Sequence, residues 1–417
     1  MFLTDDEKRM LDGQYGAGAQ KAMTLLIKFG DAFDAEKMVR VNSVHISPDL
    51  PIPFMEEMSE GIGRVSTLCS LHATFDPRLS EKEFGLSLEG SGTFAGGFAT
   101  TDGEEFARHL AILDRLGFLP TFSCTPYLTG IIPRQGDVLV WSGTSGQVAS
   151  NSLFAAKANR EGLSSALASA ITGKTPYMNL LIQENRHAKV LVQLDNLDTN
   201  QFTNADYGAL GYYIGSAVGS RNVAVDGLPG QISLEQCKFL TSPLPVSGAC
   251  TMCHIVGVTP EARTLGQALG NKRPEDTVKV GETEMRQTWE QLNTGDASKV
   301  DLVIFGCPHC TILEISEIAS LLEGKRLRKD VRLSIGTSDA MYGLARQAGY
   351  ARIIEEAGGR FTHCCAGPVN PLVHLCEPEV VATNSARAAH YIPRATAGKT
   401  GVFYGDTRSC IDSATTG

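Results

Sequence analysis

The same order of elements occurs twice near the carboxyl end of this 417-residue chain: an apolar strand-like run, a turn, and an amphipathic helix-like stretch. VDLVIFG (300–306) precedes CPHCTILEISEIASLLEGK, and VRLSIGTS (331–338) precedes DAMYGLARQAGY. In the first unit, helical spacing from Ile312 to Leu322 places the apolar residues on one face, and Gly324 should end the helix. Alternation of this kind predicts right-handed crossovers and an α/β fold with mainly parallel sheets covered by helices.

Three cysteines follow strand-like apolar runs. Cys124 follows 118–122 in FSCTPY, Cys307 follows 300–305 in IFGCPH, and Cys365 follows a shorter run in FTHCCAGP. The carboxyl ends of parallel strands border the ligand crevice of an open α/β sheet, so these thiols are predicted to converge. Three converging thiolates suit an iron–sulfur cluster with one unligated iron. Cys307 also precedes a predicted helix, whose dipole should lower the pKa of the thiol.

Length and composition narrow the class of protein. Domains of roughly 100 to 200 residues predict two or three α/β lobes, with no confident boundary inside residues 1–417. The net charge of −9, without a clustered basic surface, argues against nucleic acid and favours a small-molecule substrate. No apolar stretch approaches the roughly 20 residues of a membrane span. The opening MFLTDDEKRML has no secretion pattern, so we expect a cytoplasmic protein.

The other cysteines are expected to be mostly inert. Eleven cysteines without an export pattern indicate buried thiols plus a metal or catalytic site, and not a disulfide framework. Two CxxC pairs, Cys250 with Cys253 and Cys307 with Cys310, leave a zinc-dependent enzyme as an alternative. The pairs are further apart than the roughly 15 to 20 residues typical of a compact zinc ribbon, which disfavours it.

Two glycine-rich segments, SGTFAGG (91–97) and SGTSG (142–146), are candidates for anion-binding turns. The second follows the strand-like VLVW and precedes a predicted helix in VASNSLFAAKANR, so its hydroxyls should lie at a strand-end crevice. Residues two turns apart on that helix are expected to share a face. The candidate substrate-binding residues of this region are Ser142, Thr144, Asn151, Asn159 and Arg160, with Ser145 as a candidate catalytic residue.

Several longer segments together carry a family resemblance: LTDDEKRMLDGQYGAGAQKAM, CTPYLTGIIPRQGDVLVWS, NSLFAAKANREG, AITGKTPY, HIVGVTPEARTL, FGCPH and TNSARAAHY. The sequence resembles the large catalytic region of aconitase X, a divergent branch of the aconitase superfamily, nearly from end to end. The resemblance implies an aconitase-like multi-lobe architecture with mainly parallel sheets around a central cluster site. It also implies that the small swivelling domain is lacking and is supplied by a separate small subunit, unless the chain works alone with an altered pocket.

The resemblance implies an iron–sulfur hydro-lyase. Cys124 matches the cysteine of the family's TCTPY motif and Cys307 that of GCPH; the third ligand aligns to Cys365, with Cys364 as the fallback. The number of irons stays open, since three thiolates suit a three-iron or four-iron cluster, or a two-iron cluster with another ligand. The implied substrates are small hydroxy acids, cis-3-hydroxy-L-proline first and mevalonate 5-phosphate, for a dehydratase large subunit, as the alternative.

Polar residues near these motifs have candidate roles. Arg160 and Arg186 are expected to pair with a substrate carboxylate through the fork of the guanidinium. Ser145 and His309 are the candidate catalytic residues, which hydrogen-bond the substrate or relay protons. His309 is alternatively a group that hydrogen-bonds a cluster sulfide. His254 is expected to be a buried structural histidine.

The chain departs from the family pattern in three places. The family's acidic residue in a run resembling SESSAV is absent from 142–146, Lys157 stands in place of arginine, and Arg387 stands in place of the lysine of TNSAK. Losing that carboxylate removes a general base or a contact to a substrate amine. The substrate is therefore less defined than the metal, and a noncatalytic cluster-binding or redox-sensing protein stays open as a hypothesis of another class.

Overall fold

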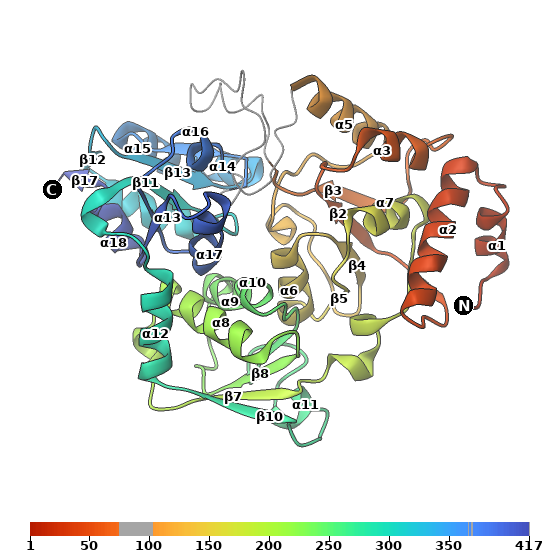
Figure 1. Cartoon of the computed structure of the whole chain (residues 1–417), viewed down its shortest axis with the longest axis horizontal. Helices are drawn as coiled ribbons and strands as arrows, with labels where there is room; N and C mark the ends of the chain where they lie inside the picture. Colours follow the sequence, from red (N-terminus) through yellow and green to blue (C-terminus); the bar gives the residue numbers. More distant parts are fainter. Residues whose placement is uncertain (75–102, 366, 368–369, 417) are drawn as a thin grey trace.

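The computed structural model describes residues 1–74, 103–365, 367 and 370–416 of the chain. Consecutive parts of the sequence build three parallel sheets (Figure 1). The red-to-yellow part of the chain forms the first lobe, the green part the second and the cyan-to-blue part the third. The predicted α/β class with mainly parallel sheets is confirmed. The predicted anion-binding turn at 91–97 lies outside the described residues.

The first lobe has a four-stranded parallel sheet in the order β3-β2-β4-β5. Its strands are β2 Ser43–Ile46, β3 Leu68–Leu71, β4 Val138–Trp141 and β5 Lys157–Ala158, with the antiparallel pair β1 Met38–Arg40 and β6 Lys174–Pro176 beside it. Its helices are α1 Asp5–Leu11, α2 Ala17–Ala32, α3 Ile52–Met58, α5 Gly103–Leu116, α6 Thr144–Leu153 and α7 Leu163–Thr172. α1 begins as its sequence predicts, because Thr4 and Glu7 form a capping box.

The second lobe has the parallel order β10-β7-β8-β9. Its strands are β7 Val190–Leu194, β8 Val223–Asp226, β9 Cys253–Ile255 and β10 Asp276–Val280; its helices are α8 Asn204–Val218, α9 Leu234–Thr241, α10 Leu244–Ser247, α11 Leu265–Ala268 and α12 Glu282–Leu292. Its core includes Val148 of α6 from the first lobe and Leu302 of the third, so the lobes share apolar packing. Such shared burial fixes their relative positions.

The third lobe has five parallel strands in the order β14-β13-β11-β15-β16. They are β11 Val300–Phe305, β13 Arg332–Gly336, β14 Arg360–Thr362, β15 Val380–Thr383 and β16 Gly401–Tyr404, beside the short pair β12 Arg326–Leu327 and β17 Thr415–Thr416. The helices are α13 Ile312–Leu322, α14 Asp339–Gln347, α15 Tyr350–Ala357, α16 Pro371–Leu375, α17 Ala386–Ala395 and α18 Thr407–Asp412. Both strand–turn–helix units predicted from the sequence are present.

Two local expectations need correction. The run 118–122 forms only an isolated parallel bridge, from Leu119 to Ser70 of β3. Pro120 has no N–H to donate and Phe122 has a positive φ of 38°, so a regular strand cannot continue. α6 begins at Thr144, earlier than predicted, and ends at Leu153, before Asn159 and Arg160. Ala155, with φ of 51°, turns the chain out of the helix. No helix among the described residues is long and apolar enough to cross a bilayer.

Candidate thiol-centred active site

The three cysteines singled out from the sequence face one another across the first and third lobes. A Cβ atom built on Gly367 would lie 3.0 Å from Cys307 Sγ and 3.7 Å from Cys365 Sγ, so both sulfurs border the same glycine. The backbone N–H of His309 donates to Cys124 Sγ at 3.1 Å, which holds the third sulfur against the loop of Cys307.

Strand ends deliver these residues. Cys307 follows β11 and Cys365 follows β14, both at the carboxyl edge of the third sheet. Cys124 comes from the first lobe, because the N–H of Ser123 donates to the carbonyl of Leu71, the last residue of β3. The Cys365 N–H also donates to the Thr74 carbonyl at 3.4 Å and joins the two lobes. The crevice therefore lies at the carboxyl ends of two parallel sheets, where α/β proteins bind ligands.

The predicted lowering of the Cys307 pKa is wrong. Burial raises the pKa of the Cys307 thiol to about 12, although the charge of Arg387 opposes the rise. α13 begins at Ile312, five residues beyond Cys307, and its first N–H groups are capped by Thr311 and Glu314. The positive end of that helix dipole is thus compensated by the Glu314 carboxylate and does not act on Cys307. Burial also raises the pKa of Cys124 to about 11, with a further contribution from Cys365.

A neutral histidine lies beside the thiols. Burial lowers the pKa of His309 to about 3, so its ring is uncharged. Its Nε2 lies 3.1 Å from the carbonyl of Cys364 and must carry the hydrogen, because a carbonyl only accepts. Its Nδ1 is then an acceptor, and it is buried with no hydrogen-bond partner among the described residues. Such an orphaned atom suggests that another group completes the site.

The hydroxyls of the 142–146 loop lie around the same crevice. Ser145 Oγ donates to the Cys124 carbonyl at 3.2 Å, and Ser142 Oγ donates to the His45 carbonyl at 3.2 Å. Thr144 Oγ1 accepts a hydrogen bond from Arg387 Nη2 at 3.1 Å. All three predicted hydroxyl residues therefore occupy the strand-end crevice.

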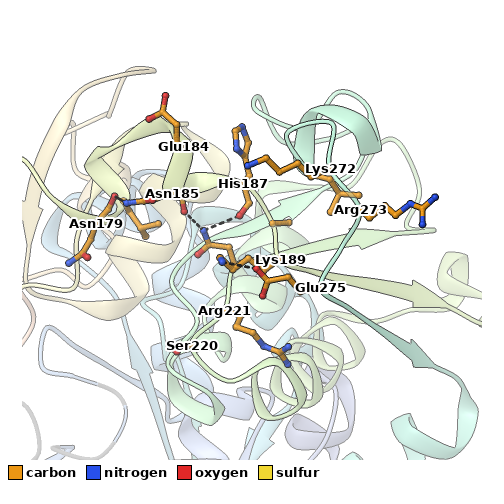
Figure 2. Close-up of a pocket in the computed structure, with 14 residues that line it drawn as sticks. Asn179, Glu184, Asn185, His187, Lys189, Ser220, Arg221, Lys272, Arg273 and Glu275 are labelled. Atoms are coloured by element: carbon orange, nitrogen blue, oxygen red, sulfur yellow. Dashed lines mark hydrogen bonds and ion pairs between the residues drawn. The ribbon is translucent and has the colours of Figure 1, made fainter.

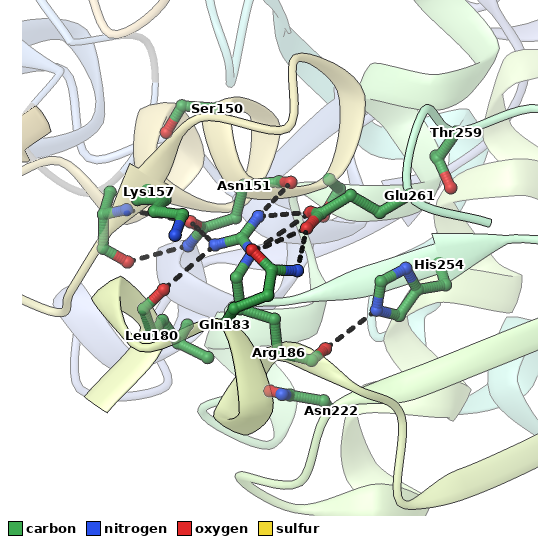
Figure 3. A network of polar contacts seen from close by, with 12 residues as sticks. Ser150, Asn151, Lys157, Leu180, Gln183, Arg186, Asn222, His254, Thr259 and Glu261 are labelled. Atoms are coloured by element: carbon green, nitrogen blue, oxygen red, sulfur yellow. Dashed lines mark hydrogen bonds and ion pairs between the residues drawn. The ribbon is translucent and has the colours of Figure 1, made fainter. Parts of the chain in front are cut away.

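Arg186 and Asn151, both candidates for substrate binding, belong instead to a buried structural network (Figure 3). Arg186 Nε and Nη2 bind the carboxylate of Glu261, while Nη1 and Nη2 also reach Asn151 and the Leu180 carbonyl. All five donors of the guanidinium are used, which leaves none for a substrate. The Asn151 side chain is likewise saturated by backbone groups of Ala158 and by Arg186. The structure thus argues against substrate contacts for both.

Asn159 and Arg160 do not share a helix face with Asn151, as the sequence had suggested. Asn159 is buried and ties down the chain at Met178 and Leu180 by accepting and donating backbone hydrogen bonds. Arg160 is exposed. Neither position places the side chain with the three thiols. His254 is buried, and its Nε2 pairs with the Arg186 carbonyl, as expected for a structural histidine.

Sequence reasoning missed a buried ion pair behind the site. Lys238 of α9 contacts the Glu314 carboxylate and donates to the carbonyls of His309, at 3.0 Å, and of Pro308. Both charged side chains are almost completely buried. The pair fixes the 307–309 loop that carries Cys307. No local pattern could have indicated it, because the partners are 76 residues apart.

A pocket in the second lobe is remote from the thiols. It has a volume of about 590 Å³ and is lined by Lys189 and Asn222, which immediately precede β7 and β8. Figure 2 shows Lys189 with the other labelled side chains of this pocket. Arg221, Lys272 and Glu275 also line it, and Lys189 pairs with Glu275 at 2.7 Å. It therefore lies at the amino ends of strands, opposite to the usual ligand edge.

The thiol site fits a multinuclear cluster better than a single ion. In a three-iron or four-iron cluster each cysteine binds a different iron, so the sulfurs need not surround one point. Within the described ranges, no group of three or more His, Cys, Asp or Glu side chains is arranged around one ion. The zinc alternative thus gains no support from the CxxC pairs. Soft thiolates, an orphaned His309 nitrogen and a glycine at 367 where a Cβ would crowd Cys307 all suit an iron–sulfur group.

Fold and site together define a multi-lobe α/β protein with a thiol-lined crevice between its first and third sheets. Three family models match successive parts of the chain: the aconitase X first domain at residues 1–184, the second domain at 188–290 and the third domain at 300–416. The chain belongs to the aconitase X family, and the resemblance read from the sequence is confirmed.

Named relatives cover the whole chain. It is 32% identical to the phosphomevalonate dehydratase large subunit of Methanocaldococcus jannaschii, over 99% of both chains. It is 30% identical to the cis-3-hydroxy-L-proline dehydratase of Hypocrea jecorina, over 100% of this chain and 69% of that enzyme. The crystal structure of Thermococcus kodakaraensis aconitase X in its holo form matches with a TM-score of 0.84 and 30% identity, over 99% of this chain and 100% of that one. The first two of these relatives are named as dehydratases, and the chain is accordingly a hydro-lyase.

Proposed function

We propose that this chain is the catalytic part of an iron–sulfur dehydratase that removes water from a small hydroxy acid. The observation that carries the proposal is the convergence of Cys124, Cys307 and Cys365 at the carboxyl ends of two parallel sheets. Similarity to dehydratases of two substrate types supports the same reaction class.

The three cysteines would hold the cluster, with Cys365 as the third ligand because its sulfur borders the same glycine as that of Cys307. When bound, such a cluster supplies a Lewis-acidic iron with an open position for the substrate hydroxyl. The Ser385 hydroxyl donates to the Cys307 carbonyl, and Lys238 donates to the carbonyl of His309. These contacts hold the ligand loop in place.

Dehydration moves a carbon-bound proton to a base and releases a hydroxide from the neighbouring carbon, which together make one water. We assign the substrate's hydrogen-bond contacts to Ser142, Thr144 and Ser145, whose hydroxyls line the crevice. His309 offers a proton acceptor at Nδ1, because its Nε2–H is directed to the Cys364 carbonyl. Enclosure of these groups keeps bulk water from the reacting atoms.

The substrate class rests on the relatives. cis-3-Hydroxy-L-proline is the first candidate and mevalonate 5-phosphate the second. A separate small subunit as partner is supported by the match to nearly the full length of a protein named as a large subunit.

Turnover tests the proposal. The anaerobically reconstituted chain should convert one of the two hydroxy acids to its dehydrated product, alone or with a candidate small subunit. Cys307→Ser should abolish turnover, and Cys250→Ser, which removes a remote thiol, should leave it unchanged. Absence of turnover of either acid by a cluster-loaded complex would contradict the dehydratase assignment and favour a noncatalytic cluster protein.

A further inference from the structure

Arg387 brings a guanidinium to the thiol site, where its partners among the described residues are uncharged. It lies in the first turn of α17, where Nη2 donates to Thr144 Oγ1 at 3.1 Å and Nη1 donates to the Ser242 carbonyl at 3.3 Å. Its Cζ lies 5.4 Å from the ring centroid of Tyr391. These partners are uncharged, and no carboxylate of the described residues forms an ion pair with it.

The neighbours of Arg387 fix it beside two of the three thiols. Ser385, two residues earlier, donates its hydroxyl to the Cys307 carbonyl. Ser145, which follows the Thr144 partner, donates to the Cys124 carbonyl at 3.2 Å. Arg387 is therefore held between two chain segments, each of which donates a hydrogen bond to the carbonyl of one of these cysteines. Burial lowers the pKa of His72, and the nearby charge of Arg387 lowers it further.

The unpaired charge contrasts with the other cations of the interior. Both arginine and lysine side chains that are fully buried in the described chain have a carboxylate partner: Arg186 pairs with Glu261, and Lys238 with Glu314. A partly buried cation without a counter-charge is costly. Within the part of the chain that the structure describes, two of the five donors of Arg387 have protein acceptors, and three are open to a ligand.

We propose that Arg387, positioned by Thr144, binds an oxyanion of the substrate, a carboxylate or a phosphate, beside the thiol site. The planar fork of guanidinium donors suits such a group. This inference rests on the proposed dehydratase function and deepens it: the substrate presents a negative group toward α17 while its hydroxyl faces the cysteines. Because no carboxylate within the described ranges pairs with Arg387, the bound group supplies the counter-charge.

Ligand binding to the full cluster-loaded chain tests the proposal by calorimetry. Arg387→Met should weaken binding of a substrate ~30-fold or more, and Arg387→Lys by ~10-fold, since the charge remains but the fork is lost. The probes are cis-3-hydroxy-L-proline with its carboxamide, and mevalonate 5-phosphate with mevalonate. In the wild type, the probe that loses its Arg387-bound oxyanion should bind weakly, and Arg387→Met should weaken it no further.

A matched pair of variants at Thr144 separates charge from size. Thr144→Glu places a carboxylate next to Arg387 and should compete with the ligand, raising its Kd ~30-fold. Thr144→Gln, of equal size and no charge, removes the same hydroxyl but adds no competing carboxylate, so it should raise Kd clearly less than Thr144→Glu does. Equal losses for both variants would overturn the proposal.

Two further results would also overturn it. One is unchanged affinity for every probe in Arg387→Met. The other is loss of iron from Arg387→Met in proportion to lost binding, which would make Arg387 only a counter-charge to the thiolates. Failure of the proposed function is a separate outcome: a wild-type chain that binds the probes through Arg387 but dehydrates none of them.

Discussion

Replacing Arg186 by methionine removes the cation at the centre of the network between α6 and the second lobe. The change deletes an ion pair with Glu261, whose side chain is only 14% exposed, and leaves the Asn151 and Leu180 carbonyls without donors. Removing one partner of a buried pair costs about 3–5 kcal/mol. We expect the free energy of unfolding of Arg186→Met to fall by that amount, measured at the first transition in urea.

Two comparisons sharpen this prediction. Removing both charges, in Arg186→Met/Glu261→Met, should recover most of the loss and leave about 1–2 kcal/mol for the unpaired carbonyls. Arg352→Met, which breaks an exposed i,i+4 pair with Glu356, should cost less than about 0.5 kcal/mol. Since the Arg186 donors are saturated, KM of the folded variant should stay near that of the wild type.

Lowering the pH should reduce the difference in the free energy of unfolding between the wild type and Arg186→Met. Burial favours a raised pKa for Glu261, but the hydrogen bonds and charge of Arg186 bring it below its ordinary value of 4.5. The stabilisation is therefore complete above about pH 4.5 and is lost as the pH falls through the lowered pKa. A variant as stable as the wild type at pH 7, with a KM raised tenfold or more, would refute the structural role of Arg186.

Other predictions follow from packing around the site. Lys238→Met should destabilise the chain by about 3–5 kcal/mol, measured by urea unfolding, and should lower its iron retention, measured by iron analysis. Adding Glu314→Leu should restore the stability but not the contacts that hold the 307–309 loop. A Cβ on Gly211 would lie 1.9 Å from the Leu240 carbonyl oxygen, so Gly211→Ala should destabilise the packing of α8 on α9. Gly343 lies in the interior of α14, and a Cβ there would meet nothing within 4 Å. Gly343→Ala should therefore stabilise the chain by about 0.5–1 kcal/mol in thermal melts. The opposite order of melting temperatures would contradict this packing.

The elements with a strong local sequence pattern were predicted correctly. β11, β13 and their following helices could be identified because each has its own apolar periodicity and its own cap, such as Thr311 at α13. The start of α6 was misplaced because Gly143 offers no side-chain cap, and that helix is held by burial on most sides. Where the local signal was weak, as at the start of α6, tertiary packing determined the helix boundary.

The site divides in the same way. Thiols and hydroxyls that follow strands could be placed, because strand ends of parallel sheets share one edge. Arg186 was misread because its partner Glu261 is 75 residues away and its burial is a property of the folded chain. The charge of Lys238 close to Cys307 was invisible for the same reason. Pairing across lobes decides whether an arginine binds substrate or holds the fold.

Iron and sulfide content after anaerobic reconstitution, read with electron paramagnetic resonance, tests the central claim most directly. The wild type should bind a cluster; Cys124→Ser, Cys307→Ser and Cys365→Ser should each lose it or change its spectrum, while Cys364→Ser and Cys250→Ser should match the wild type. A wild type free of iron under these conditions, or a cluster that survives Cys365→Ser and is lost in Cys364→Ser, would contradict the assignment of these three thiols.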